Sequence, residues 1–270
     1  MAARMANLIR SAKSGSDWSY NDLLTYNISV QSVTGTQFFG VSLSEVVPVM
    51  DEEFASFNCD SGEKPTGPKR VRNLVRNMES ATKTGNESAV DEFAYNLLVT
   101  MDYDKGERMV HMRVPIQLEV CGVSKMAQTD VCVMRDDLSV LLMVQEDKTV
   151  WNPRDPEPQA IAEAIAAFQE NNRVRNKLGL SVLKDMMIPC ITMVGTFPHF
   201  YLVPVTQHLS SCVATGQYPD VTTTVSRYIP RVPRRVSDGM RPVENRREIL
   251  RCFEAFKVFV DDLESCLAQP

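Results

Sequence analysis

Two short polar stretches, each beside an apolar run, carry residue types that could do chemistry. Asp130 opens one apolar run, and the sequence QEDK, which begins at Gln145, ends another at residues 140–144. Side chains alternate between the two faces of a strand, so Glu146 and Lys148 should project to the same face. The useful spacing is therefore acid-x-lysine, a carboxylate and an ammonium group placed side by side.

Asp130 and Glu146 can lie beside each other if their two runs form adjacent strands. Two carboxylates a few ångströms apart repel unless a proton or a divalent cation separates them. Hard cations prefer carboxylate and water ligands, so magnesium or manganese (Mg²⁺ or Mn²⁺) is the expected occupant. The alternative is that both residues are only solvated acids at strand ends.

The elements that would position these residues can be predicted from hydrophobic periodicity. Residues 87–101 repeat apolar side chains at helical spacing, with Glu87 at the edge of the apolar stripe and Glu92 pointing away from it. Three extended runs should form an antiparallel meander, and a Pro-rich loop should lead into an Ala-rich helix. The expected ranges are 109–121, 129–134 and 139–146 for the strands and 159–171 for the helix.

Further elements are expected on both sides of this core. The first sixty residues favour a helix or turn followed by a short hairpin, and residues 59–69 favour a loop. Strands are expected at 188–194 and 200–205, joined by a turn that contains His199. The spacing of Phe253 and Phe256 predicts a last amphipathic helix over 243–267.

This order of elements, with Asp130, Glu146 and Lys148 in these positions, resembles the PD-(D/E)xK nuclease superfamily, which has a restriction-endonuclease-like fold. The resemblance covers roughly residues 87–205. Thr129 stands where the motif name has Pro. The stretches AQTDVCV, LLMVQEDK and DPEPQAIAEAIAAFQENN also resemble an expanded, uncharacterised group of such proteins from mushroom-forming fungi. The resemblance implies an α/β fold.

The resemblance also implies a role for each residue. Asp130 and Glu146 would bind the metal, and Lys148 would orient the attacking water or stabilise the charge that develops at phosphorus. Glu87 could complete the metal shell, although an acid in a first helical turn is equally well explained by the helix dipole. Gln159 stands where many such nucleases carry a polar helper on the following helix.

The composition limits the other classes of function. Of the 270 residues, 44% are hydrophobic and 23% are charged, which is typical of a globular chain. The longest apolar run is far shorter than the roughly 20 residues of a membrane span, and residues 1–13 lack the apolar stretch of a secretory signal. We therefore expect no membrane association and no secretion, with a poor mitochondrial presequence as the less favoured reading of the N-terminus.

Cysteine spacing and missing sequence motifs argue against several kinds of functional site. The seven cysteines are never spaced C-x-x-C, which favours free thiols, a reducing compartment and no structural zinc. The chain lacks the G-x-S-x-G and G-x-G-x-x-G motifs, so neither a serine hydrolase nor a dinucleotide-binding protein is supported.

Basic residues are concentrated in two stretches, although the net charge is −5. Eight arginines lie in residues 227–251, and residues 64–76 hold a second cluster. Such patches could track phosphates, and a solvated face that pairs with acids is the commoner alternative. The expected nucleic-acid contacts are Arg70, Arg72, Arg231, Arg234 and Arg235.

The sequence therefore predicts an N-terminal arm (1–62), a nuclease-like core (63–210) and a basic segment with a C-terminal helix (211–270). The expected function is metal-dependent hydrolysis of phosphodiester bonds in DNA or RNA, in the cytoplasm or nucleus. The alternative is a catalytically inactive module of the same fold that binds nucleic acid or a protein partner. Because many proteins of this fold pair, a homodimer through the C-terminal helix stays open.

Overall fold

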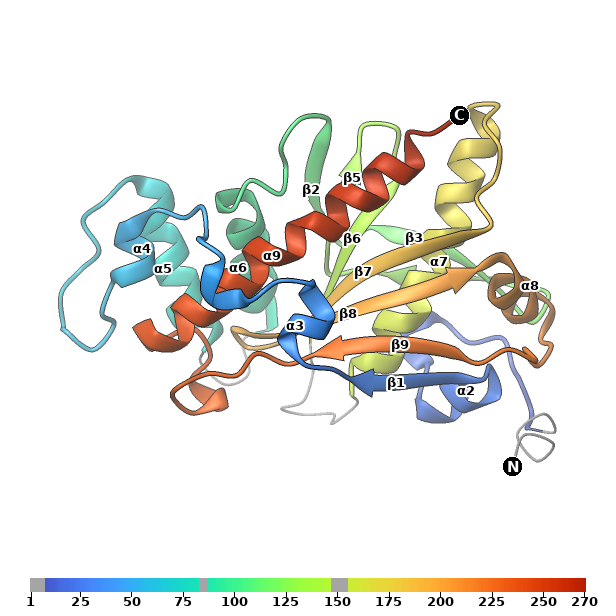
Figure 1. The fold of residues 1–270 in the computed structure, drawn as a ribbon, viewed down its shortest axis with the longest axis horizontal. Helices are drawn as coiled ribbons and strands as arrows, with labels where there is room; N and C mark the ends of the chain where they lie inside the picture. The colour runs from blue at the N-terminus through green and yellow to red at the C-terminus, as the bar shows by residue number, and fades with distance from the viewer. Residues whose placement is uncertain (1–7, 83–86, 147–154) are drawn as a thin grey trace.

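A mixed β-sheet lies at the centre of the molecule (Figure 1). The computed structural model describes residues 8–82, 87–146 and 155–270, and the side chains of Glu87 and Glu146 lie outside the described part. Over the described residues the main sheet has seven strands in the order β1-β9-β8-β7-β6-β5-β2. They are β1 (Ile28–Ser32), β2 (Arg108–Met112), β5 (Val131–Arg135), β6 (Val140–Glu146), β7 (Asp185–Val194), β8 (Phe197–Thr206) and β9 (Thr223–Tyr228).

The middle of the chain builds one half of this sheet. Helix α6 (Glu87–Thr100) is followed by β2, β5 and β6, which pair in antiparallel fashion. Helix α7 (Glu157–Lys177) then leads to β7, which pairs with β6 in parallel. The fold is mixed α/β, as predicted, and this part of the chain contains a helix, three antiparallel strands, a second helix and a further strand, with a hairpin inserted after the first of the three strands.

The prediction of a single strand over 109–121 and a loop over 121–128 was wrong. The backbone turns out of β2 at Arg113, which has a φ of 55°, and a separate hairpin of β3 (Pro115–Val120) and β4 (Val123–Gln128) follows. Cys121 and Gly122 both have positive φ, as a two-residue hairpin turn of the primed type requires. The hairpin is inserted between the first two strands of the meander.

Helix α7 is buried on nearly all sides because it lies between the main sheet and this hairpin. Small residues also let the N-terminal arm pack closely here, because a Cβ atom at Gly15 would lie 3.0 Å from the Cβ atom of Ala127 on the hairpin and 3.9 Å from that of Ala162 on α7. At its other end, Asn171 exchanges hydrogen bonds of 2.7 Å and 2.9 Å with the backbone of Val140. The helix is six residues longer at its C-terminus than the predicted range 159–171.

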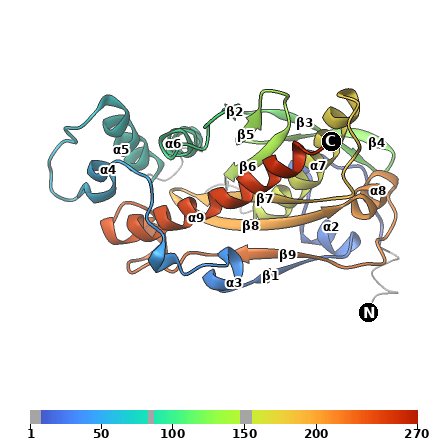
Figure 2. The same ribbon diagram turned by 45° about the horizontal axis from the view of Figure 1, so that its top comes forward.

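Helix α9 (Val243–Leu267) matches the predicted range and crosses the opposite face of the sheet (Figures 1 and 2). Phe253 and Phe256 lie 5.2 Å and 5.0 Å from the Phe200 ring of β8, measured between centroids. Aromatic rings at this spacing contribute more than their buried area alone. The two phenylalanines are therefore core residues.

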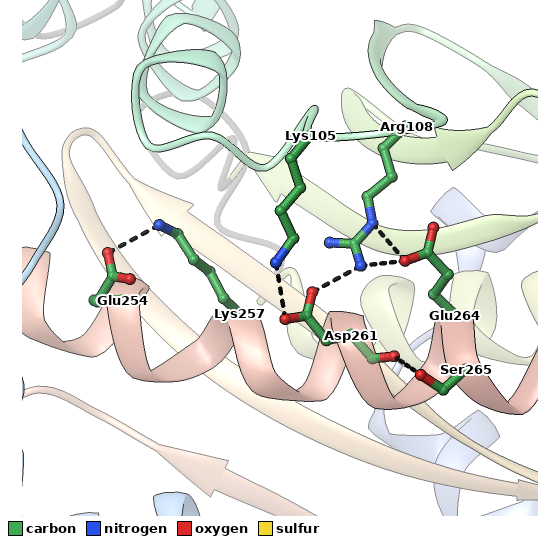
Figure 3. Close-up of polar contacts among 7 residues, drawn as sticks. All are labelled: Lys105, Arg108, Glu254, Lys257, Asp261, Glu264 and Ser265. Carbon is green, nitrogen blue, oxygen red and sulfur yellow. Dashed lines mark hydrogen bonds and ion pairs between the residues drawn. The ribbon is translucent and has the colours of Figure 1, made fainter.

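Ion pairs join the C-terminal half of α9 to Lys105, in the loop before β2, and to Arg108, the first residue of β2 (Figure 3). The buried Arg108 guanidinium contacts both Asp261, at 2.7 Å, and Glu264. Lys105 lies 3.0 Å from the other oxygen of Asp261. This network places the end of α9 over the start of the meander.

The N-terminal arm joins the same sheet at its far edge. The hairpin predicted for this region was wrong, because β1 pairs in parallel with β9 and Phe38 and Phe39 belong to a short helix. The remaining helices are α2 (Tyr20–Thr25), α3 (Gly35–Phe39), α4 (Glu52–Ser56), α5 (Lys69–Ala81) and α8 (Gln207–Thr215), with 3-10 turns η1 (Gly15–Asp17), η2 (Leu43–Glu45) and η3 (Val236–Asp238). Among the described residues, no helix is both long enough and apolar enough to span a bilayer.

Candidate active site

Asp130 lies directly before β5, where the inserted hairpin returns to the main sheet. The Arg113 amide donates to the Asp130 carbonyl at 2.9 Å, and the Thr129 amide donates to the Val114 carbonyl at 3.1 Å. These two bonds close the hairpin at its base. The backbone of Asp130 is therefore held by the hairpin as well as by the sheet.

The strand register brings the end of β6 next to Asp130. Val131 pairs with Val144, so Asp130 lies level with Gln145 and one residue short of Glu146. The Gln145 side chain is buried and its Nε2 donates to Asp130 Oδ2 at 2.5 Å. The contact that the structure describes here is made by Gln145, which the sequence had not singled out for a role, whereas the predicted contact of Asp130 with Glu146 involves a side chain outside the described residues.

A second acid near Asp130 is Asp91, which lies on helix α6. It is buried, and its Oδ2 lies 3.6 Å from the Arg113 guanidinium. Asp91 and Asp130 both line a narrow cavity of about 150 Å³, which has no room for a water-sized sphere. The other lining residues are Val90, Ala94, Val131, Val144 and Met193.

Asp91 was missed although the sequence contains a signal for it. It follows Glu87 by four residues and so lies on the same edge of the apolar stripe, one turn further along α6. The side chain of Glu87 lies outside the described residues. Among the described side chains of α6, Asp91 is therefore the acid that lines the same cavity as Asp130.

The acid-x-lysine motif itself can be placed only in part. Glu146 is the last residue of β6, and its backbone pairs with Met193 of β7. Its side chain and the whole of Lys148 lie outside the described residues. Their roles stay predictions.

Gln159 lies in the first turns of α7, half-buried, and its Nε2 donates to Glu163 Oε1 at 2.9 Å. Glu163 is fully buried in α7. Burial raises the pKa of the Cys132 and Cys190 thiols, and the nearby negative charge of Glu163 raises both further. Gln159 is thus directed toward an acid of its own helix. Glu163 was not among the predicted site residues.

A second polar cluster lies at the N-terminus of α7. The buried Glu157 accepts from Arg227 Nη1 at 2.7 Å, and Tyr20 Oη lies 3.0 Å from Glu157 and 2.7 Å from Asp155. Burial alone would lower the pKa of Arg227. The negative charge of Glu157 has the opposite and stronger effect, so the pKa of Arg227 is raised. The cluster joins the N-terminal arm, α7 and β9.

His199 is close to this cluster, on β8 rather than in the predicted turn. Burial, followed by the positive charge of Arg227, lowers the pKa of His199. The turn between β7 and β8 consists of Gly195 and Thr196 instead. A partly buried histidine with a lowered pKa is neutral near pH 7.

The arginines expected to contact nucleic acid differ in their surroundings. Arg70, Arg231 and Arg235 are exposed. Arg72 is half-buried and donates to the Gly67 carbonyl at 2.7 Å, and Arg234 lies 3.2 Å from Glu244. Arg234 is also exposed, but of these five residues Arg70, Arg231 and Arg235 are the ones that can reach a phosphate without first giving up a contact with a described residue.

Arg246 differs from its neighbours because it is fully buried. Its guanidinium donates to the carbonyl oxygens of Met240, Phe54, Phe57 and Arg241 at 2.6–2.9 Å. Burial lowers its pKa. Part of the arginine-rich segment is thus structural.

No protein-family model matches the chain, and no curated protein matches its sequence. Within residues 8–82, 87–146 and 155–270, no group of three or more His, Cys, Asp or Glu side chains is arranged to hold a metal ion. The described donors at the candidate site are two carboxylates, Asp91 and Asp130. Carboxylate oxygens are suitable ligands for a hard divalent cation.

Proposed function

We propose that the chain is a divalent-metal-dependent nuclease that hydrolyses phosphodiester bonds of DNA or RNA. The observation that carries the proposal is the placement of Asp91 and Asp130 at one cavity beside the end of β6. The order of α6, the β2-β5-β6 meander, α7 and β7 supports it, because this is the order expected of a PD-(D/E)xK core.

The proposed mechanism assigns roles to residues of three elements. Asp130 directly before β5, Asp91 from α6 and Glu146 from β6 would hold Mg²⁺ or Mn²⁺. When bound, the ion would lower the pKa of a coordinated water and neutralise charge on the scissile phosphate. Lys148 would orient the attacking water, with its positive charge stabilising the charge that develops at phosphorus.

The basic residues would supply phosphate contacts away from the cavity. Arg70, Arg231 and Arg235 are exposed and form no ion pair with another described residue, so they can release counterions from a nucleic acid without first breaking such a pair. Arg234 must first leave Glu244, so we expect it to contribute less. Phosphate contacts of this kind position a substrate without reading its sequence.

A catalytically silent nucleic-acid-binding module of the same fold is the second candidate. The observation that favours it is the position of Arg113, whose guanidinium lies 3.6 Å from Asp91 Oδ2. A guanidinium at this carboxylate can neutralise it in place of a metal ion. The two candidates differ in whether the native protein binds Mn²⁺.

The test is cleavage of labelled single- and double-stranded DNA and RNA in Mg²⁺, Mn²⁺ or EDTA. Native protein is compared with Glu146→Ala and Lys148→Ala, and circular dichroism checks that each variant is folded. Metal-dependent cutting that both substitutions abolish is the expected result. No cutting by native protein, together with no Mn²⁺ binding by calorimetry, would replace the enzyme with the silent module.

A further inference from the structure

Strand β2 is the last strand of the main sheet and pairs with β5 along its inner side (Figure 1). Helix α6 contacts β5 and β6 as well as β2, so it covers a face of the sheet rather than this edge. Within residues 8–82, 87–146 and 155–270, no strand pairs with the outer side of β2. A strand with an unpaired side presents a row of N–H and C=O groups that another strand can bind.

The sequence of β2 lacks three features that commonly block pairing at a sheet edge. Residues 108–112 contain neither proline nor lysine, and their register with β5 shows no bulge. Arg108 points inward, where Asp261 and Glu264 of α9 already neutralise its charge. Met109, in contrast, is 54% exposed. The outer side of β2 is thus open to pairing with a second strand.

The hydrogen bonds to β5 show which backbone groups of β2 face outward. The Asp136 amide donates to the Glu107 carbonyl at 3.0 Å. The Arg113 amide donates to the Asp130 carbonyl at 2.9 Å. Residues of an antiparallel pair alternate between bonding to the neighbouring strand and facing away from it. The odd-numbered residues of 107–113 therefore bond to β5, and residues 108, 110 and 112 direct their N–H and C=O groups outward.

We propose that the outer side of β2 pairs with β2 of a second copy of the chain, in antiparallel fashion about a two-fold axis at Val110. This register brings the outward N–H and C=O groups of Val110 against those of Val110 in the second copy. Arg108 lies opposite Met112 on each side of the axis, so every outward group of residues 108–112 gains a partner. Because the two-fold contact is closed, it gives a dimer and not a growing chain.

The charges beside β2 identify the occupant as a second copy, because the segment is complementary to itself. Glu107 and Arg113 are equally far from Val110 in sequence, so this register places each opposite the other in the second copy. Their side chains are exposed, at 73% and 61%, and their ion pairs within the chain are long. These measure 3.8 Å from Glu107 to Arg135 and 3.6 Å from Arg113 to Asp91. Opposite charges directly across an antiparallel pair stabilise it, and each dimer has two such pairs.

Charge reversal at the two ends tests the register. Native protein should form a dimer in sedimentation velocity over a concentration series. Glu107→Arg and Arg113→Glu each place like charges opposite each other, so each variant alone should dimerise about tenfold more weakly or worse. An equimolar mixture of the two variants should recover the dimer, since each variant then faces a partner of opposite charge.

Met109→Arg is an independent variant that removes no ion pair within the protein. It places a charged side chain beside the two-fold axis and should weaken the dimer by about tenfold or more. Met126→Arg is the matched control and should dimerise like native protein, because Met126 is 49% exposed but lies on β4 of the hairpin. Circular dichroism checks folding, and Met109→Arg decides the outcome if Arg113→Glu does not fold.

The inference fails if native protein is a monomer throughout the concentration series or grows beyond a dimer. It also fails if Glu107→Arg or Met109→Arg, correctly folded, dimerises as tightly as native protein. Folded charge variants that stay monomeric when mixed would contradict the register. None of these measurements needs metal binding or cleavage, so the outcome is independent of the proposed function.

Discussion

Gln145 and Asp130 lie level with each other on neighbouring strands, and the side-chain amide of Gln145 hydrogen-bonds the Asp130 carboxylate. This contact joins the end of β6 to the start of β5, where the inserted hairpin rejoins the sheet. Asp91 reaches the same cavity from α6. Three elements far apart in the sequence therefore meet at one acidic place.

Asp91→Asn should lower both Mn²⁺ affinity and cleavage rate, the latter by roughly 100-fold or about 2.7 kcal/mol of transition-state stabilisation. The reason is the loss of a carboxylate that borders the cavity with Asp130. Glu92→Gln is the matched control, because Glu92 is the next residue of α6 and is exposed. Equal rates for the two variants, measured under single-turnover conditions, would remove Asp91 from the site.

Much of the core could be predicted because its signals are local. Helix α9 has a long apolar stripe, and its bounds matched the prediction at both ends. The run 140–144 predicted β6 because its residues are buried on both faces of the sheet. Regular periodicity of this kind does not depend on distant partners.

The errors came from features that depend on tertiary structure. The parallel pairing of β1 with β9 joins segments almost 200 residues apart, and no local signal specifies it. The positive φ of Arg113, which separates β2 from the hairpin, occurs at a residue type that rarely adopts it. Gln145 was missed because an amide next to an acid in sequence reveals nothing about hydrogen bonding to another strand.

The stability of the protein should fall at acid pH in part through Asp261. Burial raises its pKa, but hydrogen bonds from Lys105 and Arg108 outweigh this effect and leave the pKa lowered. A carboxylate with a lowered pKa stabilises the folded state above its unfolded pKa of about 3.9, and this contribution is lost as the pH falls through the folded value. Urea unfolding from pH 6 to pH 3 should therefore show a smaller loss of free energy in Asp261→Asn than in native protein. Identical pH profiles would contradict the lowered pKa.

Substitution of Arg246 should lower the free energy of unfolding much more than substitution of Arg247, although the two residues are adjacent in an arginine-rich run. Arg246→Met leaves buried carbonyl oxygens without a donor and should lower the free energy of unfolding by about 3 kcal/mol. Arg247 is exposed, so Arg247→Ala should change the free energy of unfolding by less than about 0.5 kcal/mol. Chemical denaturation measures both. A native-like Arg246→Met would show that its hydrogen bonds do not hold the start of α9.

Nucleic-acid binding should depend on salt through the exposed arginines. Arg235→Ala should reduce the slope of log K against log salt concentration by about 1, because one phosphate contact is lost. Arg234→Ala should have a smaller effect, since Arg234 is already paired with Glu244. Fluorescence anisotropy with a labelled oligonucleotide in EDTA measures binding without cleavage. Unchanged slopes for Arg235→Ala would mean that this segment does not contact the backbone.

The most direct test of the metal site is Asp130→Asn beside Asp185→Asn, an exposed aspartate at the start of β7. Mn²⁺ affinity by calorimetry and Mn²⁺-dependent cleavage of labelled DNA and RNA are measured on the same preparations. The account predicts that Asp130→Asn, still folded by circular dichroism, loses both properties and that Asp185→Asn keeps both. Native Mn²⁺ binding and cleavage by Asp130→Asn would contradict it.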